Sequence, residues 1–201
     1  MSEGYYRFPT IAGERIVFTC EDDLWTVPLS GGVARRLTSN LGRVGRSCLS
    51  PDGSLLAFTG QEEGPTDVYC MPADGGPARR ITHLGAFTEV VGWTPDGNEV
   101  VFWSNARQPL FRVRALFTVP ADGGFGPKAM NLGPATGISF GPDGALAIHR
   151  HATDPARWKR YHGGTAGDLW IDENGNGEFR RLLDLTSNQV NPMWIGDRVY
   201  F

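Results

Sequence analysis

Two irregular stretches of the sequence, residues 104–114 and 151–167, gather basic and aromatic side chains. Together they hold six of the 19 lysines and arginines: Arg107, Arg112, Arg114, Arg157, Lys159 and Arg160. A guanidinium group can bind a carboxylate through two parallel hydrogen bonds, and it also stacks on aromatic rings. These stretches are therefore candidate binding loops for a carboxylate-bearing ligand. The alternative is that the arginines decorate solvated loops or pin neighbouring parts of the fold.

Residues that could bind a metal ion occur at two other places. Residues 172–177 match positions 1, 3, 5 and 6 of a calcium-binding loop. Leu183 stands where that loop requires its glutamate, so a hairpin turn rich in asparagine and glycine is the favoured interpretation. His149 and His151 share one face of an expected strand, but no third ligand lies at a plausible spacing. We therefore expect an exposed histidine pair at a sheet edge, no metal site and no cofactor.

The chain lacks the motifs of common catalytic and nucleotide-binding sites. It contains no GxSxG, no GxGxxG, no HExxH and no GxxxxGK followed by serine or threonine. Because its serines and aspartates fall in turn positions, we expect no catalytic residue in it. With 19 basic and 22 acidic residues, the chain has no electrostatic footprint for nucleic acid or an anionic membrane. No apolar stretch approaches the roughly 20 residues that cross a bilayer.

Cysteine usage and the first residues both indicate the cytoplasm. Cys20, Cys48 and Cys70 are odd in number and show no CxxC spacing, which favours reduced thiols packed on strands. The first nine residues contain neither the basic region nor the apolar region of a secretory signal. We therefore expect a cytoplasmic protein.

A repeat supplies the elements that must position these side chains. Residues 22–38 recur at 66–82, and shorter copies occur at 115–124 and 167–183. Their aromatic residues are spaced 44, 48 and 53 positions apart: Trp25, Tyr69, Phe117 and Trp170. Pro-Asp-Gly turns precede three of the copies, and 27 glycines and 14 prolines allow many more turns. Four short strands in each repeat of this length are typical of a β-propeller blade.

The repeat therefore predicts an all-β fold, a β-propeller of four-stranded antiparallel blades. Four blades are expected at about 5–41, 43–85, 88–133 and 136–188, and a fifth begins at 190–201. The chain ends in the second strand of that fifth blade, so we expect a single incomplete propeller that is part of a longer protein. The two basic stretches interrupt the same connection in consecutive blades, which predicts that they lie on one rim.

Three segments carry a resemblance to a known family. Residues 21–28 read Glu-Asp-Asp-Leu-Trp-Thr-Val-Pro, residues 158–164 read Trp-Lys-Arg-Tyr-His-Gly-Gly, and residues 191–201 read Asn-Pro-Met-Trp-Ile-Gly-Asp-Arg-Val-Tyr-Phe. Together they resemble the N-terminal propeller of the tricorn protease family over essentially the whole chain. The Asp-Leu-Trp and Pro-Asp-Gly elements are shared with TolB-like propellers, whereas the other two segments are more specific.

The resemblance implies a function that the residues alone do not. Tricorn proteases are cytosolic serine peptidases that form hexamers and degrade oligopeptides, and their catalytic residues lie in domains beyond a six-bladed first propeller. About four and a half of those six blades would be present here, without catalytic residues. The resemblance places Arg112 and Arg114 in the loop that would hold the substrate's C-terminal carboxylate, and Lys159 and Arg160 complete the predicted substrate-binding residues. The expected partners are oligopeptides, the remaining domains of the enzyme and further copies of the chain. A non-catalytic TolB-like interaction scaffold is the alternative.

Overall fold

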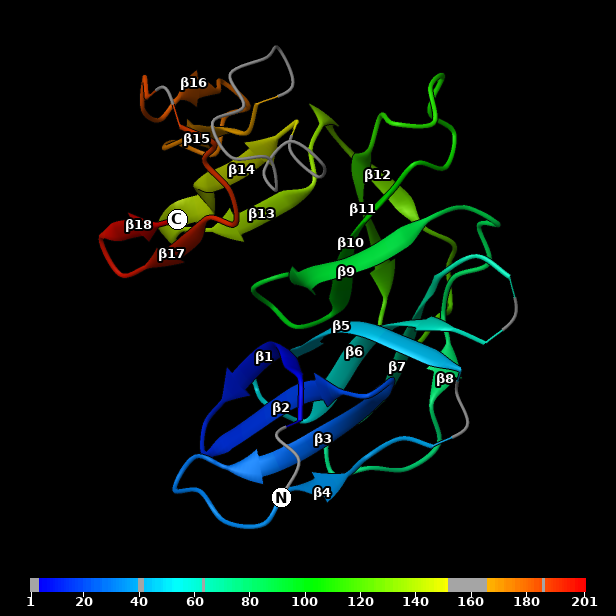
Figure 1. Ribbon diagram of the computed structural model, residues 1–201. Coiled ribbons are helices and arrows are strands. Elements are labelled where there is room, and N and C mark those ends of the chain that lie inside the picture. The colour runs from blue at the N-terminus through cyan, green and yellow to red at the C-terminus, as the bar shows by residue number, and fades with distance from the viewer. Residues whose placement is uncertain (1–3, 40–41, 63, 152–165, 186) are drawn as a thin grey trace. The chain divides into compact units, whose positions relative to one another are not determined.

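The computed structural model describes residues 4–39, 42–62, 64–151, 166–185 and 187–201, and the regular secondary structure of these residues is almost entirely β-strand (Figure 1). The strands form four antiparallel sheets of four strands and one sheet of two strands. Within the described ranges the only helix is a single 3₁₀ turn, η1 (Pro142–Gly144). No helix there is long and apolar enough to cross a membrane. The predicted all-β propeller fold with four-stranded blades is confirmed.

Each four-stranded blade follows the order of the chain. The first blade contains β1 (Tyr6–Ala12), β2 (Arg15–Cys20), β3 (Asp23–Pro28) and β4 (Arg35–Arg36). The second contains β5 (Arg43–Leu49), β6 (Leu55–Gln61), β7 (Asp67–Pro72) and β8 (Arg79–Arg80). The third contains β9 (Thr88–Trp93), β10 (Glu99–Ser104), β11 (Ala115–Pro120) and β12 (Lys128–Pro134). The fourth contains β13 (Gly137–Phe140), β14 (Leu146–Arg150), β15 (Asp168–Asp172) and β16 (Arg180–Arg181). The last sheet pairs β17 (Met193–Ile195) with β18 (Arg198–Tyr200).

The chain divides into two compact units, residues 1–107 with 117–129 and residues 108–116 with 130–201. In the first unit, the opening strands of successive blades are neighbours, since β5 contacts both β1 and β9. Buried aliphatic and aromatic side chains of the first two blades form a common core there. In the second unit, β13 contacts β17 in the corresponding way. The assignment of all 201 residues to one propeller, with the blade boundaries given above, stays a prediction.

The aromatic residues of the repeat occupy one position in every blade. Trp25, Tyr69, Phe117 and Trp170 are each the third residue of the third strand. On the strand before, a phenylalanine lies against two of these rings, with ring centroids 5.5 Å apart for Phe58 and Tyr69 and 5.6 Å apart for Phe102 and Phe117. Offset ring pairs of this kind add to the burial that holds neighbouring strands together. The predicted equivalence of the four aromatic residues is confirmed.

Hydroxyl groups beside the Pro-Asp-Gly turns fix their shape. Ser50 and Ser54 donate hydroxyl hydrogen bonds to the carboxylate of Asp52 at 2.6 and 2.7 Å, and the Ser54 backbone N–H donates at 3.1 Å. These bonds, led by that of Ser50, lower the pKa of Asp52 to about 2. Gly53 closes the turn at φ 72°, where a side chain would be strained. In the fourth blade Gly141 replaces the serine, and residues 142–144 form η1 instead.

An aspartate, an arginine and a threonine close the outer side of the first two blades; we call this set the strand lock. In the second blade, Asp67 accepts hydrogen bonds from the Arg80 guanidinium and from the Thr82 hydroxyl, the latter at 2.7 Å. Thr82 Oγ1 in turn accepts the backbone N–H of Val68 at 2.8 Å. The lock therefore ties the short outer strand β8 to the start of β7.

The first blade repeats the strand lock, and the fourth keeps part of it. Asp23 accepts from Arg36 at 2.5 Å and from Thr38 at 3.0 Å. In the fourth blade Arg181 donates to Asp168 at 2.9 Å, but Leu183 stands in the threonine position. The lock accounts for the Arg-Arg-x-Thr motif of the repeat, because the second arginine and the threonine both donate hydrogen bonds to the aspartate.

In the first two blades, the first arginine of the pair has a different role. Arg35 Nη2 donates to the backbone carbonyl of Asp74 at 2.9 Å, and Arg79 Nη2 donates to the carbonyl of Ala121 at 3.0 Å. Both acceptors lie in the turn after the third strand of the next blade. These two crossing arginines therefore pin neighbouring blades of the first unit together.

Candidate functional site

The loop between β10 and β11 begins at a well-anchored position. The Ser104 side chain is buried, and its hydroxyl donates to the Phe87 carbonyl at 2.9 Å and accepts the Ala106 N–H at 3.0 Å. The Asn105 side chain accepts the Phe87 N–H at 2.9 Å. Arg107 follows at φ 58°, which turns the chain sharply. The predicted position of this insertion, between the second and third strands of the third blade, is confirmed.

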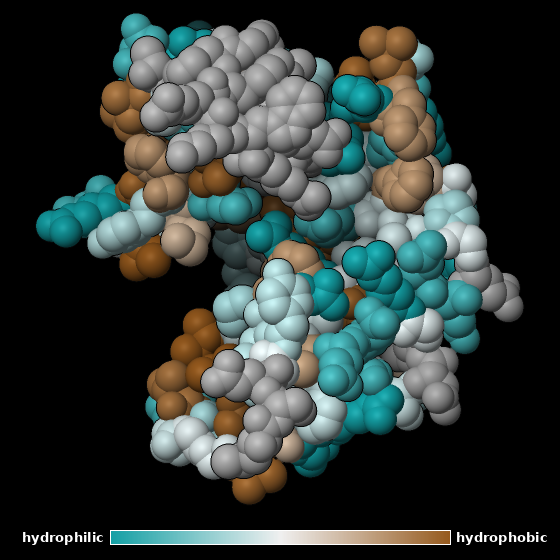
Figure 2. Space-filling model, viewed as in Figure 1, coloured by the Kyte–Doolittle hydropathy of each residue, from teal (hydrophilic) through white to brown (hydrophobic). Residues whose placement is uncertain are grey.

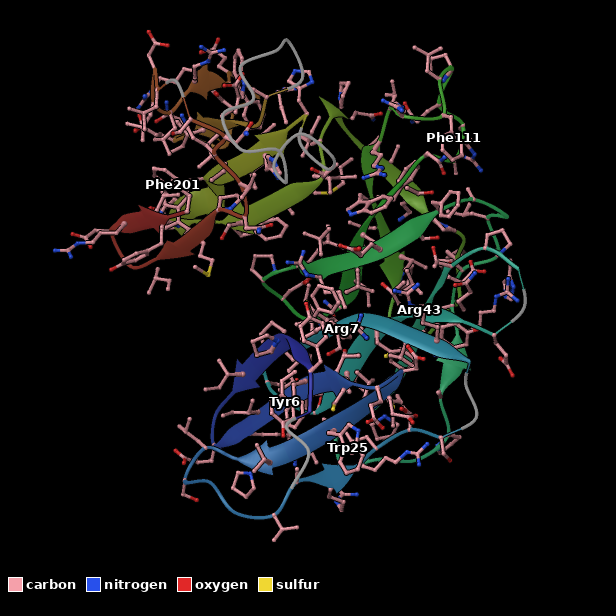
Figure 3. All side chains as sticks on the ribbon, in the orientation of Figure 1. Tyr6, Arg7, Trp25, Arg43, Phe111 and Phe201 are labelled. Atoms are coloured by element: carbon pink, nitrogen blue, oxygen red, sulfur yellow. The ribbon has the colours of Figure 1, made fainter. Side chains whose placement is uncertain are left out.

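The tip of the loop combines an exposed cation with apolar side chains. Leu110 and Phe111 are both exposed, and Figure 3 labels Phe111 on the loop between β10 and β11. In the space-filling view, hydrophobic residues gather on this loop at the upper right (Figure 2). A turn closed by the Val113 N–H on the Leu110 carbonyl, at 3.0 Å, leaves Arg112 exposed between them. An exposed guanidinium beside apolar side chains suits the end of a peptide, which carries a carboxylate next to a side chain.

Arg114 is half-buried, and its neighbourhood contains an arginine that the sequence analysis did not select. The Arg114 carbonyl accepts the Ala135 N–H at 3.0 Å. Arg150 donates to the adjacent Pro134 carbonyl at 3.3 Å, and its guanidinium carbon lies 5.3 Å from the centre of the Trp170 ring. Burial lowers the pKa of Arg150 from its usual value. Residues 134–135 thus join Arg114 and Arg150 in the second unit.

Arg150 was missed because it lies at the end of a strand, where the repeat alignment stops, and outside the two basic stretches. The signal that could have found it is the aromatic position of the repeat, since Trp170 lies on the neighbouring strand β15. Lys159 and Arg160 lie outside the described residues, as does most of the second basic stretch. The connection that contains it, between β14 and β15, is the one expected.

The first of the two candidate metal sites, at residues 172–177, is a hairpin loop. Asp172 is buried, and its carboxylate accepts the N–H groups of Asn174, Asn176 and Gly177 at 3.2, 3.3 and 2.7 Å. Burial acts to raise the pKa of Asp172, but the hydrogen bonds from these backbone N–H groups lower it by more. The pKa of Asp172 is therefore below its ordinary value. The carboxylate is thus turned toward its own loop, and the hairpin interpretation is confirmed.

The expected exposed histidine pair is wrong for one of its members. His149 is only 4% exposed, because β14 lies between β13 and β15 and is not an edge strand. His151 is exposed after the strand ends. Across the part of the chain that the structure describes, no three histidine, cysteine, aspartate or glutamate side chains gather as metal ligands would. The cysteines there are free thiols.

These features are those of a known protein family. The family model for the tricorn protease N-terminal beta propeller domain matches residues 3–201. The chain belongs to this family. Tricorn protease homolog 1 of Streptomyces coelicolor is 42% identical over 98% of this chain and 18% of its own length. The Tricorn protease of Thermoplasma acidophilum is 37% identical over 96% of this chain and 19% of its own length.

The tricorn propeller family also includes a chain of similar length. A candidate Tricorn-like protease N-terminal subunit of Sulfurisphaera tokodaii is 31% identical over 87% of this chain and 90% of its own length. A solved crystal structure of the tricorn protease superposes with a TM-score of 0.87 at 34% identity, over 98% of this chain and 20% of that one. This chain therefore spans about a fifth of the larger relatives. TolB from Acinetobacter baumannii, at a TM-score of 0.70 and 19% identity, shares the fold alone.

Proposed function

We propose that this chain is the N-terminal propeller portion of a tricorn-type serine peptidase that degrades oligopeptides. This portion binds or gates substrate or product and contributes no catalytic residue. The observation that carries the proposal is the match of almost the whole chain to only 18% of the length of a tricorn protease homologue. The remaining four-fifths of such a relative leave ample chain for the catalytic domains.

The proposal includes the partners that follow from the family. The other domains of the same enzyme are partners, and copies of it assemble into a hexamer. The cytoplasm is the proposed location, and three free thiols suit a reducing compartment. Oligopeptides are the proposed substrates, held by their C-terminal carboxylate.

The first test is the peptidase activity of the chain by itself. Purified residues 1–201 should not cleave short fluorogenic peptides, because no nucleophile paired with a base is recognisable in the sequence. A full-length enzyme that contains this propeller serves as the positive control. Cleavage by the isolated chain that disappears when one of its own serines is replaced would contradict the proposal.

The second test concerns the carboxylate site at Arg112 and Arg114. A charge-assisted hydrogen bond to a carboxylate contributes roughly 1.5–3 kcal/mol. Replacing either arginine by alanine in the full-length enzyme should therefore raise KM about ten- to a hundredfold for peptides with a free C-terminus. Peptides with an amidated C-terminus should be nearly unaffected.

Arg43→Ala provides the matched control, because Arg43 is also exposed and lies outside both basic loops. It should change neither kind of substrate. Equal losses on free and amidated peptides, or no loss on either, would leave the loop as scaffolding and remove the carboxylate role. The same comparison on Lys159→Ala and Arg160→Ala tests the second loop.

A further inference from the structure

Two equivalent grooves run between neighbouring blades of the first unit. The first groove, of about 740 Å³, lies between the first and second blades and is lined by Arg15, Arg35 and the Pro-Asp-Gly turn at 51–53. The second groove, of about 1050 Å³, lies between the second and third blades and is lined by Leu55, Arg79 and the turn that contains Gly97. Each groove thus has the second and fourth strands of one blade on one wall and a turn of the next blade on the other.

The strand registers fix which residues correspond. Phe18 is paired with Trp25, and Phe58 is paired with Tyr69, so the two phenylalanines are equivalent. Counting back three residues from each makes Arg15 of the first blade equivalent to Leu55 of the second. The same alignment makes Asp74, two residues after the end of β7, equivalent to Asp122, two residues after the end of β11.

The two turns also pack alike, which supports the correspondence. A Cβ built on Gly75 would contact Leu37, and a Cβ built on Gly123 would contact Ile81. Leu37 and Ile81 both follow the arginine pair of their blade directly. The turns with Asp74 and Asp122 therefore rest on the same part of the preceding blade.

The two grooves differ in whether an arginine compensates the negative charge of this aspartate. In the first groove the guanidinium of Arg15 forms an ion pair with the Asp74 carboxylate. In the second groove Leu55 takes the place of the arginine. Among the described residues, the Asp122 carboxylate accepts one hydrogen bond, from the Gly124 N–H of its own turn at 2.9 Å. The second groove is also larger, and the Asp122 carboxylate lines it, whereas Asp74 is paired with Arg15 beside the first groove.

The remaining lining of the second groove is apolar with an acidic rim. Its apolar residues are Leu55, Met71, Pro72, Pro77, Pro120 and Phe125. Phe125 is 75% exposed, although it lines the groove. Asp96, Glu99 and Asp122 contribute three carboxylates, and that of Asp96 accepts hydrogen bonds from Thr94 and Asn98 in its own turn. The one guanidinium in the lining, of Arg79, donates to the Ala121 carbonyl. The groove is therefore complementary to a cationic group flanked by apolar ones.

We propose that the second groove binds an extended segment of a partner protein that carries one arginine between aliphatic residues. The arginine of the partner contacts Asp122 as Arg15 contacts Asp74 in the first groove, and its aliphatic neighbours cover Phe125 and Leu55. This site shares no residue with the carboxylate site at Arg112 and Arg114, and it recognises the opposite charge. It stands independently of the proposed peptidase function.

The experiment is a binding titration of the 201-residue chain, followed by fluorescence anisotropy. The probe is a dye-labelled peptide Ala-Leu-Arg-Leu-Ala, and the control probe has glutamate in place of arginine. The arginine peptide should bind with 1:1 stoichiometry and a dissociation constant below about 1 mM, as is usual for a weak, transient contact. The glutamate peptide should bind at least about tenfold more weakly.

Three variants connect the binding to the groove. Leu55→Arg supplies the internal arginine of the first groove and should weaken binding at least about tenfold, and Asp122→Asn should weaken it about three- to tenfold. Arg15→Leu opens the first groove and should raise the stoichiometry toward two. Asp197→Asn, at an exposed carboxylate outside the groove, is the matched control and should change nothing.

Circular dichroism of each variant checks that the sheets are intact. If Leu55→Arg does not fold, the comparison of Asp122→Asn with Asp197→Asn decides the question. Absence of saturable binding at about 1 mM, equal binding of both peptides, or unchanged binding by Asp122→Asn would overturn the proposal.

Discussion

Removing Arg80 from the strand lock of the second blade should destabilise the chain more than removing the equivalent Arg36 from the first. The difference follows from burial. The Asp67 side chain is 2% exposed and that of Arg80 is 31% exposed, whereas the corresponding values for Asp23 and Arg36 are 18% and 48%. Arg80→Ala therefore leaves a carboxylate buried without its cation, whereas Arg36→Ala leaves one that water can reach.

The magnitudes follow from these environments. Breaking a buried ion pair by removing one partner costs about 3–5 kcal/mol. Because part of the Arg80 side chain is solvated and Thr82 still donates to Asp67, we expect about 2–3 kcal/mol for Arg80→Ala. Arg36→Ala should cost no more than about 1 kcal/mol. For a chain of this size the melting temperature should fall by about 4–12 °C in the first case and by at most about 2–4 °C in the second.

The assay is urea unfolding followed by tryptophan fluorescence and by circular dichroism, with the slope m compared between variants. The double variant Asp67→Asn/Arg80→Ala should recover at least about 1 kcal/mol relative to Arg80→Ala alone, because the uncompensated charge is gone. Equal losses for Arg36→Ala and Arg80→Ala, or a double variant no more stable than the single one, would refute the burial argument.

Three further predictions concern particular side chains. Asp52→Asn should lower stability at neutral pH, and because the pKa of Asp52 is lowered from 3.8 to about 2, the difference from the unchanged chain should shrink as pH falls from 3.8 through about 2; pH-dependent urea unfolding measures it, and a difference that grows on acidification would contradict it. Burial raises the pKa of the Cys48 thiol to about 11, so its alkylation by iodoacetamide, followed by peptide mass spectrometry, should still accelerate between about pH 9 and 10; a plateau by pH 9 would contradict this. Gly141→Ala would place a Cβ 2.6 Å from the Trp194 ring and should cost about 1–3 kcal/mol with a change in tryptophan emission, whereas Gly126→Ala, which has open space, should be neutral in the same unfolding assay.

The repeat predicted the blades well because each blade depends on local patterns. Alternation along one strand and a turn every few residues suffice to place Trp25 and Tyr69 at equivalent positions. The burial of His149 could not be predicted in this way, because it depends on which strands lie on both sides of β14. The 3₁₀ turn at residues 142–144 coincides with the loss of two hydroxyl groups, since Gly141 and Ala145 stand where the second-blade turn has Ser50 and Ser54.

The residues of the candidate sites could be predicted only in part, because several of their contacts depend on how strands pair and on how two blades compare. The basic stretches could be recognised from composition, but the approach of Arg150 to Trp170 follows from strand pairing. The difference between the two inter-blade grooves depends on Arg15 and Leu55, which are equivalent only once the registers are known. Neither residue is unusual in its own segment, so the contrast emerges only when the grooves are compared.

The crossing arginines have a consequence for the evolution of such a chain. Arg35 and Arg79 bind carbonyl oxygens of the polypeptide backbone, one at an aspartate and the other at an alanine. Every amino acid supplies that oxygen, so the residue that receives the arginine can change its side chain while the contact persists. A duplicated or transplanted blade would therefore find a compatible neighbour at once, provided that its turn kept its shape. Such joints allow the number of blades and their surface chemistry to diverge separately.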